Sequence, residues 1–106
     1  MNDLVVVTYT GGVLEIRFNR PEKKNALTRG MYEAVSAALE RADADPAIRV
    51  ALLTGTGDTF TSGNDVKDFQ QSGADRAPRG GSRFLPVISS LQKPLIAAVN
   101  GAAIGV

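Results

Sequence analysis

The sequence has 106 residues, 12 basic and 11 acidic, so its formal net charge is +1. That length allows one domain at most, and the balanced charge does not indicate binding to nucleic acid or to a membrane surface. Cysteine and histidine are both absent, which excludes disulfides, thiol nucleophiles and histidine catalysis and leaves almost no ligands for zinc.

No run of the sequence approaches the roughly 20 apolar residues of a membrane span. The first residues also lack a basic segment followed by a signal-like apolar core. We therefore expect a soluble, unprocessed protein with no metal, no nucleic-acid partner and no membrane partner, located in the cytoplasm.

The chain opens with two β-rich runs, residues 4–9 and 13–18, separated by Thr10-Gly11-Gly12. Two short strands around a glycine turn predict a β-hairpin. In the second run apolar and charged residues alternate, so it is expected to bury Leu14, Ile16 and Phe18 on one face only.

The next segment, residues 19–27, is polar and includes Arg20, Lys23 and Lys24. Its composition is typical of a solvated loop. A helix then follows, in which Thr28 is expected to be the N-cap and Asp45-Pro46 the end. Its predicted buried face consists of Met31, Ala34, Val35, Ala38, Leu39 and Ala42.

A short apolar run, residues 48–53, predicts a buried parallel strand. The Gly55-Thr56-Gly57 that follows is not a dinucleotide fingerprint, because Phe60 stands at the third glycine position. No Gly-Lys-Ser/Thr follows either, so a Walker loop is also excluded.

Two stretches share one pattern: an apolar strand is followed by a turn of small residues and then by residues that can begin a helix. In the first, Gly63 suits a tight bend and Asp65 suits a helix cap before a short helix over residues 66–71. In the second, Asn100-Gly101 follows the apolar run 94–99. Alone, each is an ordinary βα connection; side by side, their N–H groups would form an anion site.

Between these turns, residues 72–81 have the composition of a flexible surface loop. Phe84, Val87, Ile88 and Leu91 then recur at helical spacing, with Pro86 tolerable only in the first turn of that helix. Phe60 and Phe69 are expected to belong to the core rather than to a substrate site.

Three segments occur in an order that identifies a family: residues 19–27 (NRPEKKNAL), residues 60–69 with Ser-Gly-Asn-Asp at their centre, and residues 93–105 (KPLIAAVNGAAIG). In this order they resemble the crotonase superfamily of enoyl-CoA hydratases and isomerases. The resemblance covers the chain from near Leu4 to its last residue. It implies an α/β fold with parallel strands in a ββα spiral and helices outside, of which residues 1–106 would be the N-terminal portion of a single domain.

For the site, the resemblance implies an oxyanion hole formed by the backbone N–H groups of Asn64 and Val106. It also implies that residues 72–81 form a mobile wall of the acyl pocket, and that the loop of residues 19–27 borders the nucleotide end of coenzyme A, where its basic side chains face phosphates. Asp65 is favoured as a helix cap over a base, and Lys67 as either a phosphate contact or an exposed lysine. The implied contacts to the substrate are Lys24, Ala26, Ser62, Gly63, Asn64, Asp65, Val66, Lys67 and Gly105.

The implied substrate is an acyl-CoA thioester in fatty-acid metabolism, with coenzyme A as part of the substrate and no separate cofactor. Ser-Gly-Asn-Asp favours Δ3-Δ2 isomerisation, and 2-enoyl hydration is the other expected reaction. The family's acid–base carboxylates would lie beyond Val106, so the chain alone is expected to be inactive. A non-catalytic acyl-CoA binder and an inactive fragment remain alternatives, and the parent protein is expected to be a homotrimer or hexamer.

Overall fold

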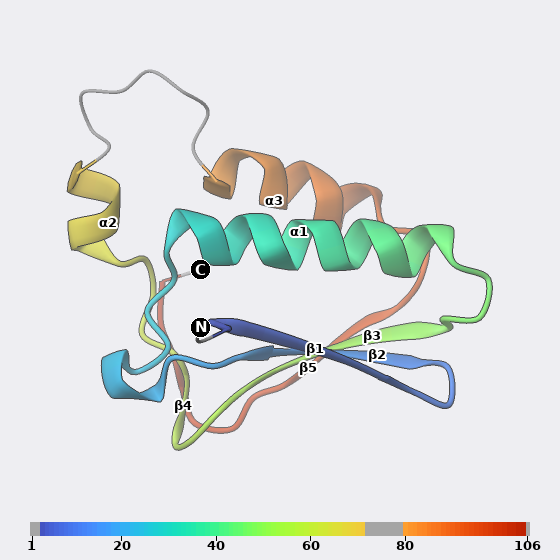
Figure 1. The fold of residues 1–106 in the computed structure, drawn as a ribbon, viewed down its shortest axis with the longest axis horizontal. Coiled ribbons are helices and arrows are strands. Elements are labelled where there is room, and N and C mark those ends of the chain that lie inside the picture. The colour runs from blue at the N-terminus through green and yellow to red at the C-terminus, as the bar shows by residue number, and fades with distance from the viewer. Residues whose placement is uncertain (1–2, 72–79, 106) are drawn as a thin grey trace.

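The computed structural model describes residues 3–71 and 80–105. It shows an α/β fold in which two long helices cover one face of a four-stranded sheet (Figure 1). The sheet has the strand order β1-β2-β3-β5. Its strands are β1 (Val5–Thr10), β2 (Val13–Phe18), β3 (Val50–Gly55) and β5 (Leu95–Ala98).

The predicted hairpin is confirmed. β1 pairs with β2 in antiparallel register, with Thr10 opposite Val13, so Gly11 and Gly12 alone form the turn. Both glycines have positive φ, 56° and 85°, which the favoured two-residue hairpin turn requires. The predicted alternation also holds, because Leu14, Ile16 and Phe18 are buried.

β2, β3 and β5 are parallel, as the sequence predicted for the strand after the first helix. That strand begins at Val50 rather than at Ile48, which is buried in the preceding turn. A second, two-stranded parallel sheet joins β4 (Thr59–Thr61) to β6 (Ala102–Ala103). Each strand of the small sheet directly follows a strand of the large one, so both strand pairs lead the chain towards the same end of the fold.

Helix α1 (Arg29–Ala44) begins and ends where the sequence predicted. The Thr28 side chain accepts a hydrogen bond from the Met31 N–H, and Asp45 is the C-cap. The predicted buried face needs one correction, because Ala34 is exposed whereas Tyr32 and Ser36 are buried. The reason is that α1 packs against helix α3 as well as against the sheet, so its buried arc is wider and is rotated from the predicted stripe (Figure 1).

Helix α2 (Val66–Gln71) matches its prediction, whereas α3 (Gly80–Ser90) starts earlier than expected. Residues 72–79 of the predicted loop lie outside the described residues, but Gly80 and Gly81 belong to α3. Pro86 is therefore well inside the helix, not in its first turn. Phe84 and Val87 are buried against α1, and this packing outweighs the one N–H donor that proline lacks.

The segment predicted as a solvated loop is anchored by a buried asparagine. Residues 19–27 contain the short 3-10 helix η1 (Pro21–Lys23), and Asn25 behind it is 0% exposed. Its Nδ2 donates to the carbonyl oxygens of Thr59 at 2.7 Å and Thr56 at 3.0 Å, while its Oδ1 accepts from the Arg20 N–H at 2.8 Å. The Asn25 backbone carbonyl accepts from the Thr61 hydroxyl at 2.8 Å. One side chain thus joins the loop to the start of β4.

Replacing Asn25 by alanine should lower the free energy of unfolding by about 3 kcal/mol or more. The Arg20 N–H and the Thr56 carbonyl lose this partner, and the Thr59 carbonyl keeps only the longer bond from Asn100 Nδ2 at 3.4 Å. A buried polar group left unpaired costs roughly 1–3 kcal/mol. Asn25 also has φ 56°, which alanine adopts less readily. Urea denaturation of Asn25→Ala beside Lys24→Ala measures this effect, because Lys24 has φ 52° but an exposed side chain. Equal losses in the two variants would contradict the role given to the Asn25 amide.

Candidate functional site

Two backbone turns from distant parts of the chain lie against one another. β4 and β6 bring residues 62–64 beside residues 104–105, and the Ile104 N–H donates to the Thr61 carbonyl at 3.0 Å. Gly63 has φ 98°, and a Cβ added there would lie 3.0 Å from the Ile104 carbonyl oxygen. Only glycine therefore suits this position, both for its backbone conformation and for its contact with the second turn.

The second turn differs in detail from the prediction. Asn100-Gly101 was expected to be the turn between a strand and a helix, but the short strand β6 follows it instead. The Asn100 side chain is used structurally: its Oδ1 accepts from the Gly55 N–H at 3.1 Å and its Nδ2 donates to the Gly57 carbonyl at 2.9 Å. The backbone next to Gly63 is that of Ile104 and Gly105.

Asn64 is held by its two neighbours in the chain. The Gly63 carbonyl accepts from the Leu27 N–H, and the Asp65 N–H donates to the Leu27 carbonyl, both at 2.8 Å. Because adjacent amides of an extended segment alternate in direction, the N–H of Asn64 itself faces away from Leu27. Within residues 3–71 and 80–105 this N–H has no hydrogen-bond partner, so it is available to an acceptor from outside.

Asp65 is the N-cap of α2, as the sequence predicted. Its Oδ1 accepts from the Asp68 N–H at 3.0 Å, and its Oδ2 binds Arg20 Nη1 at 2.6 Å. The Asp68 N–H first, and the Arg20 guanidinium second, hold the pKa of the Asp65 carboxyl below its ordinary value. An ionised carboxylate that is already engaged by two donors is a structural anchor rather than a free base.

An open polar pocket of about 470 Å³ lies beside this turn. Five of the predicted substrate contacts, Ala26 and residues 64–67, line it together. Arg20 and Lys23 also line it, and they belong to the loop whose basic side chains the family resemblance placed near the phosphates of coenzyme A. Thr28 and Asp68, the other lining residues, were not predicted for the site. Three basic side chains, Arg20, Lys23 and Lys67, line the pocket beside two acidic ones, Asp65 and Asp68, and Arg20 is paired with Asp65. Lys23 and Lys67 are therefore the basic groups that suit an anionic ligand here.

The remaining predicted contacts lie around the pocket or away from it. Ser62 and Gly63 belong to the first turn, where the Ser62 N–H donates to the Lys24 carbonyl at 3.0 Å. Gly105 lies beside Gly63. The Lys24 side chain is directed elsewhere, because its Nζ lies 3.5 Å from Asp58 Oδ1. Val106 and residues 72–79 lie outside the described residues, so the predicted second N–H donor and mobile wall have no described geometry.

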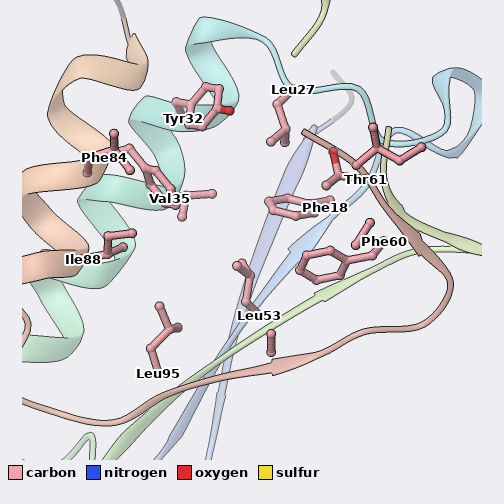
Figure 2. Close-up of a pocket in the computed structure, with 14 residues that line it drawn as sticks. Phe18, Leu27, Tyr32, Val35, Leu53, Phe60, Thr61, Phe84, Ile88 and Leu95 are labelled. Atoms are coloured by element: carbon pink, nitrogen blue, oxygen red, sulfur yellow. The ribbon is translucent and has the colours of Figure 1, made fainter. Parts of the chain in front are cut away.

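A second, apolar cavity of about 250 Å³ lies between the sheet and the helices (Figure 2). Phe18 and Phe60 form one wall, with ring centroids 5.4 Å apart, and Ile104 of the second turn also lines it. Phe60 therefore packs against the core, as expected, but it also faces this cavity. The remaining lining residues are Leu27, Tyr32, Val35, Leu53, Thr61, Phe84, Leu85, Ile88, Leu95, Ala97 and Ala103.

Tyr32 connects this apolar cavity to the turn. Its ring lines the cavity next to Phe84, and its hydroxyl donates to the Oδ1 of Asn64. Burial raises the pKa of the Tyr32 hydroxyl, so it stays protonated at neutral pH. Sequence reasoning missed Tyr32 because it lies off the predicted stripe; the available signal was an aromatic residue near the start of a helix that has no other aromatic residue.

In residues 3–71 and 80–105, no three acidic side chains gather as they would around a metal ion. No helix in this described part has the length and apolar character needed to cross a bilayer.

Comparison with known proteins places this geometry in a family. The model of the enoyl-CoA hydratase/isomerase family matches residues 8–106. The rat enoyl-CoA delta isomerase 2 is 39% identical over 96% of this chain, and the carnitinyl-CoA dehydratase of Escherichia coli ATCC 8739 is 38% identical over 99% of it. The chain spans 27% and 41%, respectively, of the length of these two relatives.

A solved structure supports the same family assignment. The crystal structure of an enoyl-CoA hydratase/isomerase from Pseudoalteromonas atlantica superimposes with a TM-score of 0.90 at 45% identity, over 97% of this chain and 40% of that one. Family model, sequence relatives and fold thus coincide over nearly every residue. The chain belongs to the enoyl-CoA hydratase/isomerase family, with the crotonase fold that its motifs predicted.

Proposed function

We propose that this chain forms the oxyanion side of a site for acyl-CoA thioesters, in a protein that isomerises or hydrates enoyl-CoA in fatty-acid metabolism. The observation that carries the proposal is the contact between the two turns at Gly63 and Ile104-Gly105. It holds the Asn64 N–H, which has no hydrogen-bond partner among the described residues, beside the backbone that leads into Val106.

The chemistry explains why such a pair of turns is useful. When a proton leaves the α carbon of a thioester, or water adds at the β carbon, negative charge collects on the thioester oxygen. Fixed N–H donors aimed at that oxygen stabilise the charge without reorganisation, and one such donor is typically worth about 10²–10³ in rate. In this proposal the donors are the backbone N–H groups of Asn64 and Val106.

The two cavities suit the two ends of an acyl-CoA. The polar pocket offers Lys23 and Lys67 to the phosphates of coenzyme A, whereas its third cation, Arg20, is paired with Asp65. The apolar cavity beside Thr61 and Ile104 matches a short acyl chain. Asn64 borders the first, and its bonding partner Tyr32 borders the second, so a thioester group would lie between them.

Isomerisation is the favoured reaction. Ser-Gly-Asn-Asp at the first turn indicates it, and the rat and human enoyl-CoA delta isomerases 2 match at 39% and 38% identity. Asp65 is engaged by Arg20 and by the Asp68 N–H, which leaves it unsuited to proton transfer. The acid–base carboxylate is proposed to lie outside this chain, which by itself binds the thioester and polarises it.

The compartment is proposed to be the cytoplasm. One mouse relative, 35% identical over 96% of this chain, is named enoyl-CoA delta isomerase 3, peroxisomal.

Gly63→Ala should weaken the binding of a short acyl-CoA such as hexanoyl-CoA by about tenfold or more. The added Cβ would meet the Ile104 carbonyl oxygen at 3.0 Å, and the backbone at φ 98° disfavours alanine, so the two turns must separate. About 1–3 kcal/mol of strain is expected, and 1.4 kcal/mol corresponds to tenfold in affinity. Isothermal titration calorimetry of the 106-residue chain measures the change.

Gly11→Ala is the matched control for this substitution. Gly11 also has positive φ, 56°, but a Cβ there would meet nothing within 4 Å. This variant should lose stability in urea yet bind the acyl-CoA as the parent chain does. Equal affinity of Gly63→Ala and Gly11→Ala would contradict the proposal, as would the failure of the parent chain to bind any acyl-CoA.

Lys67→Ala should weaken acyl-CoA binding by about threefold to tenfold, with a weaker dependence of affinity on salt. Lys67 lines the polar pocket, where a phosphate contact is charge-assisted and screened by ions. Lys24→Ala should cost less, because the Lys24 ammonium faces Asp58. Calorimetry at low and at physiological ionic strength compares the two variants. A larger loss of affinity for Lys24→Ala than for Lys67→Ala would mean that the phosphates bind beside Lys24 and not beside Lys67.

A further inference from the structure

We propose that Tyr32 is a positioning residue that orients the side chain of Asn64, so that the Asn64 amide NH₂ becomes an additional hydrogen-bond donor to the thioester. On this proposal the Tyr32–Asn64 pair makes the site prefer a thioester carbonyl over the same ligand without it. The inference rests on the proposed function, because it assumes that acyl-CoA binds beside Asn64.

The Tyr32 ring has little freedom to move. It is 6% exposed and lies among rings of two other helices. Its centroid is 5.3 Å from that of Phe84 on α3 and 6.3 Å from that of Phe69 on α2, both in edge-to-face arrangement. Figure 2 shows the hydroxyl pointing away from Phe84, towards the side where Leu27 lies. The helices therefore fix where the hydroxyl is placed.

The hydroxyl uses that fixed position to bind one side chain. It donates to Asn64 Oδ1 across 32 positions of the chain. Because burial raises its pKa, the hydroxyl keeps its proton and remains a donor throughout the neutral range. A neutral tyrosine thus fixes which end of the Asn64 amide faces the helix.

The consequence lies at the other end of the amide. An asparagine side chain has one carbonyl oxygen and an NH₂ group with two donors. With the oxygen bound by Tyr32, the NH₂ group is the part left available, and within residues 3–71 and 80–105 it has no hydrogen-bond partner. Asn64 therefore offers donors from its side chain as well as from its backbone.

The location of the pair indicates which ligand group these donors would meet. Tyr32 lines the apolar cavity and Asn64 lines the polar pocket, so their hydrogen bond marks the boundary between the two. An acyl-CoA has its carbonyl at the corresponding boundary, between the hydrocarbon chain and the polar coenzyme. Without the Tyr32 hydroxyl the amide would rotate freely, because the hydrogen bond that fixes its orientation would be lost.

The test compares two ligands that differ only at the carbonyl: hexanoyl-CoA and its thioether analogue hexyl-CoA, which has CH₂ in place of C=O. Calorimetry of the 106-residue chain gives the ratio of the two affinities. Tyr32→Phe keeps the ring and removes only the hydroxyl, and it should reduce this ratio by about fivefold through weaker thioester binding. Tyr9→Phe is the matched control, because it removes the hydroxyl that donates to the Ala47 carbonyl at 3.1 Å on an exposed surface.

Asn64→Ala provides a second variant that does not disturb the core, because Asn64 is exposed. It should lower the ratio as Tyr32→Phe does, and the double variant should lower it no further, since both substitutions remove the same interaction. The measurement on Asn64→Ala still tests the inference if Tyr32→Phe folds poorly.

The outcomes separate the two proposals. If the parent chain prefers the thioester and neither Tyr32→Phe nor Asn64→Ala changes that preference, the inference is overturned while the proposed function stands. If the parent chain binds neither ligand, the proposed function fails and the inference fails with it. A purely structural role of Tyr32 would lower stability and leave the ratio of affinities unchanged.

Discussion

The geometry of the site depends on one buried side chain, Asn25. It holds the carbonyls of Thr56 and Thr59 and the N–H of Arg20, so it joins the loop after β2 to the start of β4. The loop then continues directly into Leu27, whose N–H and C=O hold the backbone on both sides of Asn64. The Asn25 side-chain amide is fully buried, and both its oxygen and its NH₂ group are hydrogen-bonded. It thereby sets the position of the first turn.

The rest of the fold brings the second turn to that place. Parallel pairing of β3 with β5 aligns their carboxyl ends, and β4 and β6 extend the alignment by a second short ladder. α1 and α3 press on one face of the sheet and bury its apolar residues. Gly63 then allows the two turns to touch, because any side chain there would collide with Ile104. Hydrophobic packing thus brings into contact two polar backbone segments whose touching residues, Gly63 and Ile104, are 41 positions apart in the sequence.

Local signals predicted the local structure well. The paired glycines predicted the hairpin, and Asp65 was predicted correctly as the cap of α2. Thr28 and Asp45-Pro46 marked the start and the end of α1. What sequence reasoning missed depends on contacts between distant segments. Tyr32 is buried in place of Ala34 because α3 lies beside α1. Asn25 is buried because it binds carbonyls more than 30 residues away, and the Lys24 side chain takes its direction from Asp58. Pro86 inside α3 likewise reflects tertiary packing that outweighs helix propensity.

The most direct test of the two-turn site is a titration of the ¹⁵N-labelled chain with hexanoyl-CoA, followed by the backbone amide signals in NMR. We predict that the amide signals of Asn64 and of residues 104–106 shift together and saturate at the same ligand concentration. Because the donors would bind the thioester oxygen, hexyl-CoA should shift these signals much less. Shifts confined to the polar pocket around Lys67, with the amides of both turns unchanged, would contradict the account: the chain would then bind the coenzyme without holding the thioester.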